Sequence, residues 1–272
     1  EQLEARTGVQ VLAAVIGKAD HYPEVPWKAF ALATALAVLV LAARALIDPP
    51  WFAPVHAAAD AVIAIGVGLL GALLALPVAL ARISDSKLLR GVSFSYVYFF
   101  RGTPLLAQTF LVYYGAGQFR AELEAVGLWW LFREAYLCAI LTFTLNTAAY
   151  QAEILRGAIQ AVPIGQSEAA AALGLKGWTT LRKIILPQAF VIALRPLGNE
   201  VILMIKGSAI ASVITVYDLM GTTRLAFSRS FDFEVYLWAA VLYLVVVEVL
   251  RRVWDRLEIR ITRHMRPATA RT

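Results

Sequence analysis

The chain has 272 residues, of which 60% are hydrophobic and 16% charged, and its formal net charge is +6. Soluble domains carry about 25% charged residues, so this composition argues against a soluble globular protein. The apolar residues are also gathered into blocks: 21 uncharged residues separate Asp60 from Arg82, and 18 separate Glu134 from Glu153. Because a helix rises 1.5 Å per residue, about 20 such residues cross the hydrocarbon core of a bilayer. The sequence therefore predicts an integral membrane protein.

An all-α membrane fold is expected, because lipid offers no partners for backbone groups and the ten-residue alternation of a membrane barrel is absent. The expected spans lie at about residues 27–47, 57–81, 104–118, 134–151, 190–205 and 235–250. The third span borrows apolar residues from 93–100, and Arg195 with Pro196 is expected to mark the cytoplasmic start of the fifth. The first span, in an N-terminal segment of residues 1–56, is interpreted as an extra membrane helix, because a signal sequence would show a clear cleavage site.

The distribution of basic residues predicts the orientation. With a cytoplasmic N-terminus, eighteen lysines and arginines fall in cytoplasmic segments and five in external ones, in agreement with the positive-inside rule. Residues 253–272 then form a basic cytoplasmic tail. Its basic residues do not alternate with aromatic residues as in a nucleic-acid groove, so no nucleic-acid partner is expected.

The polar stretch at 153–187 is expected in the cytoplasm, between the fourth and fifth spans. It contains a short alanine-rich helix at 167–173, with Ser167 as the expected N-cap and Gly174 as a left-handed cap. A helix this short is marginal alone, so it needs a surface to pack against. The segment is therefore either a helix that docks on a partner protein or an ordinary connecting loop.

No catalytic or metal-binding set is apparent in the sequence. The phosphate-binding pattern G-x-x-x-x-G-K-[ST] does not occur, His21, His56 and His264 are scattered, and Cys138 is the single cysteine. Residues 66–71 match G-x-G-x-x-G, but they lie in an uncharged span with no preceding strand, so close helix packing is the expected role. The chain is expected to be no enzyme and to bind no cofactor or metal itself.

A pattern in the polar stretch resembles the EAA motif of ABC importer permeases at every fixed position. Together with the expected cap, its residues are Ser167, Glu168, Ala169, Ala170, Gly174, Ile184, Leu186 and Pro187. Two further segments are similar to the polar amino acid branch of that family: residues 144–150, and the run Arg101, Gly102, Thr103 and Pro104. The resemblance covers about residues 57–265 and is closest to the M-type subunits of histidine, arginine, octopine and nopaline importers. Two features depart from it: the additional span at 27–47, and Ile164 where a polar residue is expected.

The resemblance implies a type I ABC importer transmembrane domain at 57–252, with a five-helix core, one extra N-terminal helix and a coupling loop at 153–187. It implies a multi-pass permease of the bacterial inner membrane that takes up basic amino acids or opines (the arginine, histidine, lysine, octopine or nopaline class). The implied partners are a second, Q-type permease subunit, an ATPase dimer that binds ATP and Mg, and a periplasmic solute-binding protein. The alternative, an ion-gradient-driven secondary transporter of polar solutes, would need internal repeats or paired broken helices, and no repeat is seen between the two halves.

The resemblance, with the intramembrane charges, also predicts a substrate pathway. Ionisable groups at membrane depth cost about 2.5–3.5 kcal/mol on insertion scales and are tolerated where they face a cavity or a partner. The expected pathway residues are Asn146, Glu153, Glu200, Lys206, Gly207 and Ser208. Each assignment has an open alternative. Glu200 and Lys206 could instead form an internal ion pair that packs helices, and Glu153 could instead have a structural role at the cytoplasmic edge.

Overall fold

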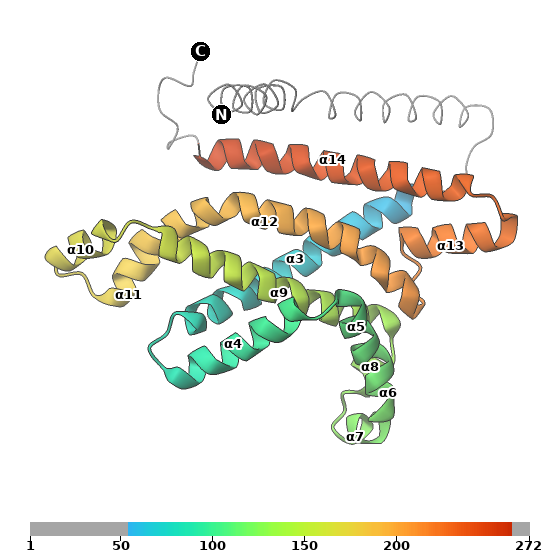
Figure 1. The fold of residues 1–272 in the computed structure, drawn as a ribbon, viewed down its shortest axis with the longest axis horizontal. Coiled ribbons are helices and arrows are strands. Elements are labelled where there is room, and N and C mark those ends of the chain that lie inside the picture. The colour runs from blue at the N-terminus through green and yellow to red at the C-terminus, as the bar shows by residue number, and fades with distance from the viewer. Residues whose placement is uncertain (1–53, 263–272) are drawn as a thin grey trace, which may run out of the picture. The chain divides into compact units, whose positions relative to one another are not determined.

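The computed structural model describes residues 54–262, and this part of the chain is helical and contains no strand. Its first half consists of α3 (Pro54–Arg82), α4 (Lys87–Gly102), α5 (Leu105–Phe110), the π-helical η1 (Leu111–Gly115), α6 (Ala116–Gln118), α7 (Arg120–Ala125) and α8 (Trp129–Phe132) (Figure 1). Its second half consists of α9 (Ala135–Ala161), α10 (Gly165–Ala172), α11 (Gly177–Thr180), the π-helical η2 (Leu181–Ile185), α12 (Leu186–Ser208), the 3₁₀-helical η3 (Ala209–Ile214), α13 (Leu219–Ser230) and α14 (Glu234–Thr262). The expected span at 27–47 and the end of the basic tail lie outside the described residues.

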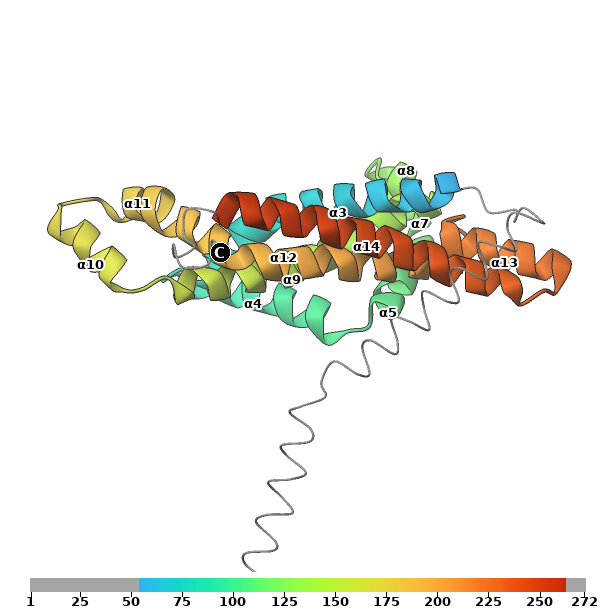
Figure 2. The ribbon, with the colours of Figure 1, turned by 90° about the horizontal axis from the view of Figure 1, so that it is seen from above.

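Helix α9 lies at the centre of the described bundle. Its most extensive contacts are with α3 and then with α12, which lies beside α9 in both views (Figures 1 and 2). Two helices approach closely only where side chains are small. A Cβ on Gly71 of α3 would lie 2.5 Å from Cγ2 of Thr147 and 3.3 Å from the backbone nitrogen of Ala148. Of the residues that match G-x-G-x-x-G, Gly71 therefore allows the α3–α9 contact, whereas a Cβ on Gly66 would meet nothing within 4 Å.

Two apolar clusters fill the bundle. One joins α3, α4, α9 and the start of α12, and seven of its buried members are alanines from α3, α9 and α12, namely Ala75, Ala79, Ala149, Ala152, Ala158, Ala189 and Ala193. The other lies toward the opposite ends of α3 and α12 and includes Val67, Phe143 and Met204. Cys138 is fully buried in this second cluster, in accord with a packing role.

The third span differs from the expectation. The prediction that it borrows residues 93–100 is wrong, because these residues belong to a separate helix, α4. Pro104 has no N–H and disfavours helical geometry at the residue before it, so α4 ends at Gly102 and Thr103 is extended. The side-chain amide of Gln108 then donates to the carbonyls of Phe100 and Thr103, at 2.9 and 3.0 Å, and so satisfies backbone groups at the break.

Three helix boundaries also differ from the expectation. Arg195 and Pro196 do not lie at a helix start: α12 begins at Leu186 and is continuous with η2, so both residues lie within it. Helix α9 runs ten residues beyond the expected 151, and α14 runs to Thr262, so the first residues of the basic tail are helical. Of the described helices, the segments Asp60–Arg82 and Gly177–Ile214 are long and apolar enough to cross a membrane.

The contact between α12 and α14 gives a test of the packing. Gly198 leaves room for the indole of Trp254, whose N–H donates to the carbonyl of Leu194 at 3.0 Å, and a Cβ at position 198 would collide with that ring. We expect Gly198→Ala to lower the stability of the detergent-solubilised protein by about 1–3 kcal/mol, because overpacking forces a shift of the helices. The measurement is the thermal unfolding midpoint.

The matched control is Gly157→Ala on α9, where a Cβ would meet nothing within 4 Å. Alanine is the better helix former by about 1 kcal/mol, so this variant should be neutral or stabilised. Equal midpoints for the two variants would contradict the packing described for Gly198.

Candidate functional site

The alanine-rich helix α10 projects from the end of the bundle (Figures 1 and 2), and apolar side chains at its two ends are exposed. Ile164 and Leu173, at its start and end, are 76% and 78% exposed, and Trp178 of the following helix α11 is 64% exposed. Apolar groups gathered on a protruding element are typical of a surface that binds another protein. Ile164, which departs from the expected polar residue, belongs to this surface.

The end of α10 is fixed by its backbone. Gly174 has φ of 70°, as the left-handed cap requires. The N–H of Leu175 donates to the carbonyl of Ala170 at 3.0 Å, and the N–H of Gly174 donates to that of Ala171 at 2.9 Å. This pair of bonds is a Schellman motif, which holds the short helix in a defined orientation.

The start of α10 corrects the expected N-cap. The helix begins at Gly165, its first flanking residue is Ile164, and no side chain caps it. The carbonyl of Pro163 accepts from the N–H of Gln166, so the first turn forms before Ser167, whose side chain is exposed within the helix.

The remaining residues of the predicted coupling set fall into two groups. Glu168 and Ala169 are exposed on α10, whereas Ala170 is buried against the bundle. Ile184 packs on the core cluster, and Leu186 and Pro187 form the first turn of α12. The side chain of Gln188 donates to that of Gln166 at 3.3 Å and so links α10 to α12. A groove of about 480 Å³ lies between the end of α9, α10, α11 and η2, lined by Val162, Ala171, Leu181 and six neighbours.

Glu153 lies in an ion-pair cluster and does not line the large cavity described below. Its carboxylate pairs with Arg82 of α3 at 3.5 Å and with Arg156 one turn further along α9. Nearby, Arg101 of α4 lies over the ring of Tyr150, 5.2 Å from its centroid. These contacts favour the structural role for Glu153.

A chain of buried polar groups links the helices in the middle of the bundle. Thr147 of α9 donates to the carboxylate of Glu200 on α12 at 3.1 Å, and Gln151 donates to Thr147 and to the carbonyl of Gly68 on α3. Asn146 donates to the side chain of Gln108 at 2.9 Å. These bonds satisfy polar groups at a depth where unpaired groups are costly.

The structure does not contain the ion pair between Glu200 and Lys206 that the sequence left open. Lys206 is exposed, and within residues 54–262 its ammonium makes no ion pair with Glu200. Gly207 approaches α5, since a Cβ there would lie 3.3 Å from a methyl group of Leu105. Ser208 is buried and donates to the carbonyl of Ile205.

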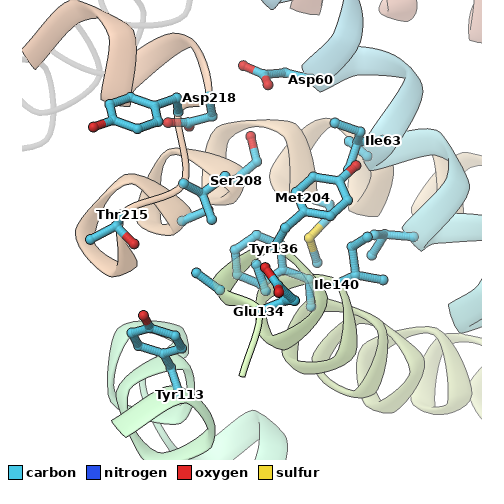
Figure 3. A pocket seen from close by; sticks show the side chains of 18 of the residues that line it. Asp60, Ile63, Tyr113, Glu134, Tyr136, Ile140, Met204, Ser208, Thr215 and Asp218 are labelled. Carbon is cyan, nitrogen blue, oxygen red and sulfur yellow. The ribbon is translucent and has the colours of Figure 1, made fainter. Parts of the chain in front are cut away.

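A cavity of about 490 Å³ lies between α3, α9, α12, η1 and the loop before α13 (Figure 3). Of the predicted pathway residues, Ser208 lines it, and Asn146, Glu153, Glu200, Lys206 and Gly207 do not. Its walls are largely apolar, with Ile63, Val67 and Met204 among them. Polar groups lie toward its ends. The lining includes Asp60, Arg133, Glu134 and Asp218, which sequence reasoning did not select.

The two aspartates meet at the start of α13. Asp218 caps α13, accepting from the N–H of Gly221 at 2.7 Å, and Asp60 of α3 accepts from the N–H of Leu219 at 2.8 Å. Burial raises the pKa of Asp218 to about 6, and the nearby charge of Asp60 adds to the effect, whereas the bond from Gly221 opposes it. Asp218 follows the long apolar helix α12 and η3 and lies in a loop outside the spanning segments. The position of Asp218 directly before a helix could have indicated its role as an N-cap. Its contact with Asp60 could not be predicted in this way, because Asp60 is 158 residues away in the sequence.

The chain is similar to known transport proteins along most of its length. Residues 66–263 match the family model described as "binding-protein-dependent transport system inner membrane component". The chain is 44% identical to the nopaline transport system permease protein NocM of Agrobacterium fabrum, over 73% of this chain and 83% of that one. It is 40% identical to the octopine permease OccM of Rhizobium radiobacter, over 70% and 77%. It is 44% identical to the arginine ABC transporter permease ArtM of Escherichia coli, over 56% and 68%.

Solved structures agree with these sequence similarities. A structure described as an amino acid ABC transporter with histidines superimposes with a TM-score of 0.66 and 35% identity, over 74% of this chain and 90% of that chain. The MetNI methionine ABC transporter, at 22% identity and a TM-score of 0.60, shares the fold over 75% and 93%.

The buried carboxyl of Asp218 predicts a pH-dependent stability. Because the pKa of Asp218 is raised above the usual 3.8, the folded protein binds a proton at this carboxyl more tightly than the unfolded chain does. The protonated carboxyl therefore stabilises the fold below about pH 4, and this stabilisation is lost as the pH rises through about 6. Asp218→Asn keeps the oxygen that accepts from Gly221 and removes the charge. We expect it to be more stable than the wild type at pH 8, by on the order of 2 kcal/mol, and to lose that advantage toward pH 4.

Thermal unfolding midpoints measured between pH 4 and pH 8 test this expectation. Asp85→Asn, which removes an exposed carboxylate from the loop between α3 and α4, is the control and should show no such trend. A difference between Asp218→Asn and wild type that stays constant with pH would exclude a raised pKa.

Proposed function

The chain belongs to the family of binding-protein-dependent transport system inner membrane components, and on this premise we propose that it conducts basic amino acids or opines. The family expected from the sequence is confirmed, and so are the all-α fold of an ABC importer transmembrane domain and the function as a permease of an amino acid or opine ABC importer, whereas the expected helix count stays a prediction. The ion-gradient-driven alternative finds no support among the relatives. The basic solute class is supported by the named solutes of the similar permeases, nopaline, octopine and arginine.

The partners belong to the same proposal. In it, a separate ATPase dimer binds ATP and Mg and hydrolyses the nucleotide, because the sequence lacks a phosphate-binding loop of its own. A second, Q-type permease subunit completes the pore, and a periplasmic binding protein delivers the solute. The assembly lies in the bacterial inner membrane, in line with the family description.

The observation that carries the coupling proposal is the surface around α10. Ile164 and Leu173, which flank this helix, and Trp178 of α11 are exposed, and the helix is held by the Schellman motif and by the bond from Gln188. A partner that moves α10 would also move η2 and α12, which form one continuous helical run. Helix α12 carries Glu200, bonded to α9, and Ser208, in the wall of the cavity. Movement of the ATPase would thus reach the solute path through connected helices.

Uptake by the reconstituted importer tests the function. The complete assembly in proteoliposomes, with its binding protein, should accumulate arginine, histidine, octopine or nopaline. It should do so only when ATP is supplied on the side of the membrane where the ATPase lies. Neutral amino acids of similar size serve as the control. Uptake driven by an ion gradient without the ATPase, or equal uptake of neutral and basic solutes, would contradict the proposal.

The left-handed conformation of Gly174 tests the coupling step. A side chain at this φ costs about 1–2 kcal/mol, although the space around Gly174 is open, so Gly174→Ala should loosen the end of α10. We expect several-fold less uptake per ATP hydrolysed, with normal insertion in the membrane. Gly174→Asn is the matched control, because asparagine tolerates this conformation, and it should keep most of the coupling. Equal coupling in the alanine and asparagine variants would rule out a role for the cap.

A further inference from the structure

Basic side chains gather where the end of α3 meets the start of α4. The 23 residues from Asp60 to Arg82 are apolar enough to cross a membrane, and at about 1.5 Å per residue they span about 30 Å of hydrocarbon. Arg82 therefore lies at the depth of the lipid headgroups, on the side that the distribution of basic residues predicts to be cytoplasmic. The loop after it leads to Lys87 and Arg90 in the first turn of α4, toward the end of the bundle from which α10 projects (Figure 1).

The protein leaves the guanidinium of Arg82 incompletely bonded. Its side chain is 16% exposed, its Nε is buried, and no acceptor among residues 54–262 reaches that nitrogen. Its contact with the carboxylate of Glu153, at 3.5 Å, is longer than the roughly 2.7–2.9 Å of a charge-assisted hydrogen bond. The other oxygen of Glu153 accepts from Arg156 at 2.7 Å. A buried donor without an acceptor is destabilising unless a ligand or water supplies one.

Positive charge is in excess around this guanidinium. Four cationic side chains and two carboxylates lie here: Arg82, Lys87, Arg90 and Arg156, with Asp85 and Glu153. Arg82 and Arg156 share the carboxylate of Glu153, and within residues 54–262 neither Lys87 nor Arg90 makes an ion pair. Arg90 donates instead to the carbonyl of Ser84 at 3.5 Å, so its guanidinium lies against the same loop. The excess of positive charge favours an anion at this place.

Aromatic side chains continue this face of α4 toward the hydrocarbon. The guanidinium of Arg82 lies 5.0 Å from the ring centroid of Phe94, which is one turn after Arg90 on the same face of α4. Tyr98, one turn further, stacks on Phe94 with ring centroids 5.8 Å apart. Phe94 and Tyr98 are 50% and 71% exposed. A phospholipid, whose phosphate carries acyl chains, can contact both the basic and the aromatic groups, whereas free phosphate can contact only the basic ones.

We propose that Arg82, Lys87 and Arg90 bind the phosphate of an anionic phospholipid of the inner leaflet. The acyl chains of this lipid lie along Phe94 and Tyr98. The phosphate supplies the acceptor that Arg82 lacks within the described part of the chain. Basic groups between membrane helices on the cytoplasmic side are a typical recognition site for anionic headgroups. The inference goes beyond the conduction of solutes, since it assigns a lipid site to the loop between α3 and α4.

The test compares phosphatidylglycerol with phosphatidylcholine of the same acyl chains. The complete importer, with its ATPase and second permease subunit, is purified in detergent, stripped of lipid and titrated with each lipid, and native mass spectrometry measures the bound fraction. The wild type should bind phosphatidylglycerol about tenfold more tightly or better, because the choline cation opposes the basic side chains. Arg82→Gln should lower this preference several-fold. Glu153 keeps Arg156 in this variant, so assembly should be retained.

Arg90→Gln, at an exposed position, is a second variant that should also lower the preference. The matched control is Arg182→Gln on η2, which removes an exposed arginine elsewhere on the predicted cytoplasmic side and should keep the wild-type preference. A wild type that binds the two lipids equally, or a preference that both Arg82→Gln and Arg90→Gln retain, would show the inference to be wrong.

Inorganic phosphate is the third arm of the test. If it raises the thermal unfolding midpoint as much as phosphatidylglycerol does, and Arg82→Gln abolishes both effects, the site takes free phosphate and a lipid is not its occupant. Solute uptake in proteoliposomes decides the proposed function separately, because these binding measurements use no solute.

Discussion

The close approach of α3 and α9 is the constraint on which the rest of the bundle depends. Helices in lipid gain little from apolar contact alone, so they associate through small residues and through hydrogen bonds between their polar groups. Gly71 gives α9 room to contact α3, and Gln151 crosses that contact to bond the carbonyl of Gly68. With α9 fixed in this way, Thr147 and Asn146 are held where they bond α12 and α5. One helix thus positions the elements around it.

The same connections explain how a movement at one end reaches the other. Helix α10 is too short to be stable alone, and its orientation depends on the Schellman motif and on Gln188. From there η2 and α12 continue without a break to Ser208, in the wall of the cavity. The polar chain around Glu200 and the indole of Trp254 tie α12 to α9 and α14 along the way. A rigid displacement is therefore passed on as a change between whole helices, which suits a pore that opens by rearrangement of its subunits.

Local patterns in the sequence were informative where one helix or one turn decides the outcome. The uncharged runs placed α3, the first part of α9 and most of α12, and the glycine at 174 has the expected left-handed conformation. The sequence was less informative where neighbours decide. Residues 93–100 looked like part of a span, but Pro104 ends their helix first. An ion pair between Glu200 and Lys206 was one of the alternatives that the sequence left open, but Thr147, 53 residues away, is the partner of Glu200. Asp60 and Asp218 lie close together in the fold although they are far apart in the sequence, and no local spacing predicts that contact.

The central claim is that α10 lies on the cytoplasmic side and transmits the movement of an ATPase. A single cysteine introduced at exposed Glu168, with Cys138 buried and unreactive, measures this directly. In the assembled importer it should crosslink to the ATPase subunit, with a yield that changes on adding ATP, and should resist membrane-impermeant reagents applied outside intact cells. Labelling from the outside, or no crosslink to any nucleotide-hydrolysing subunit, would contradict the account.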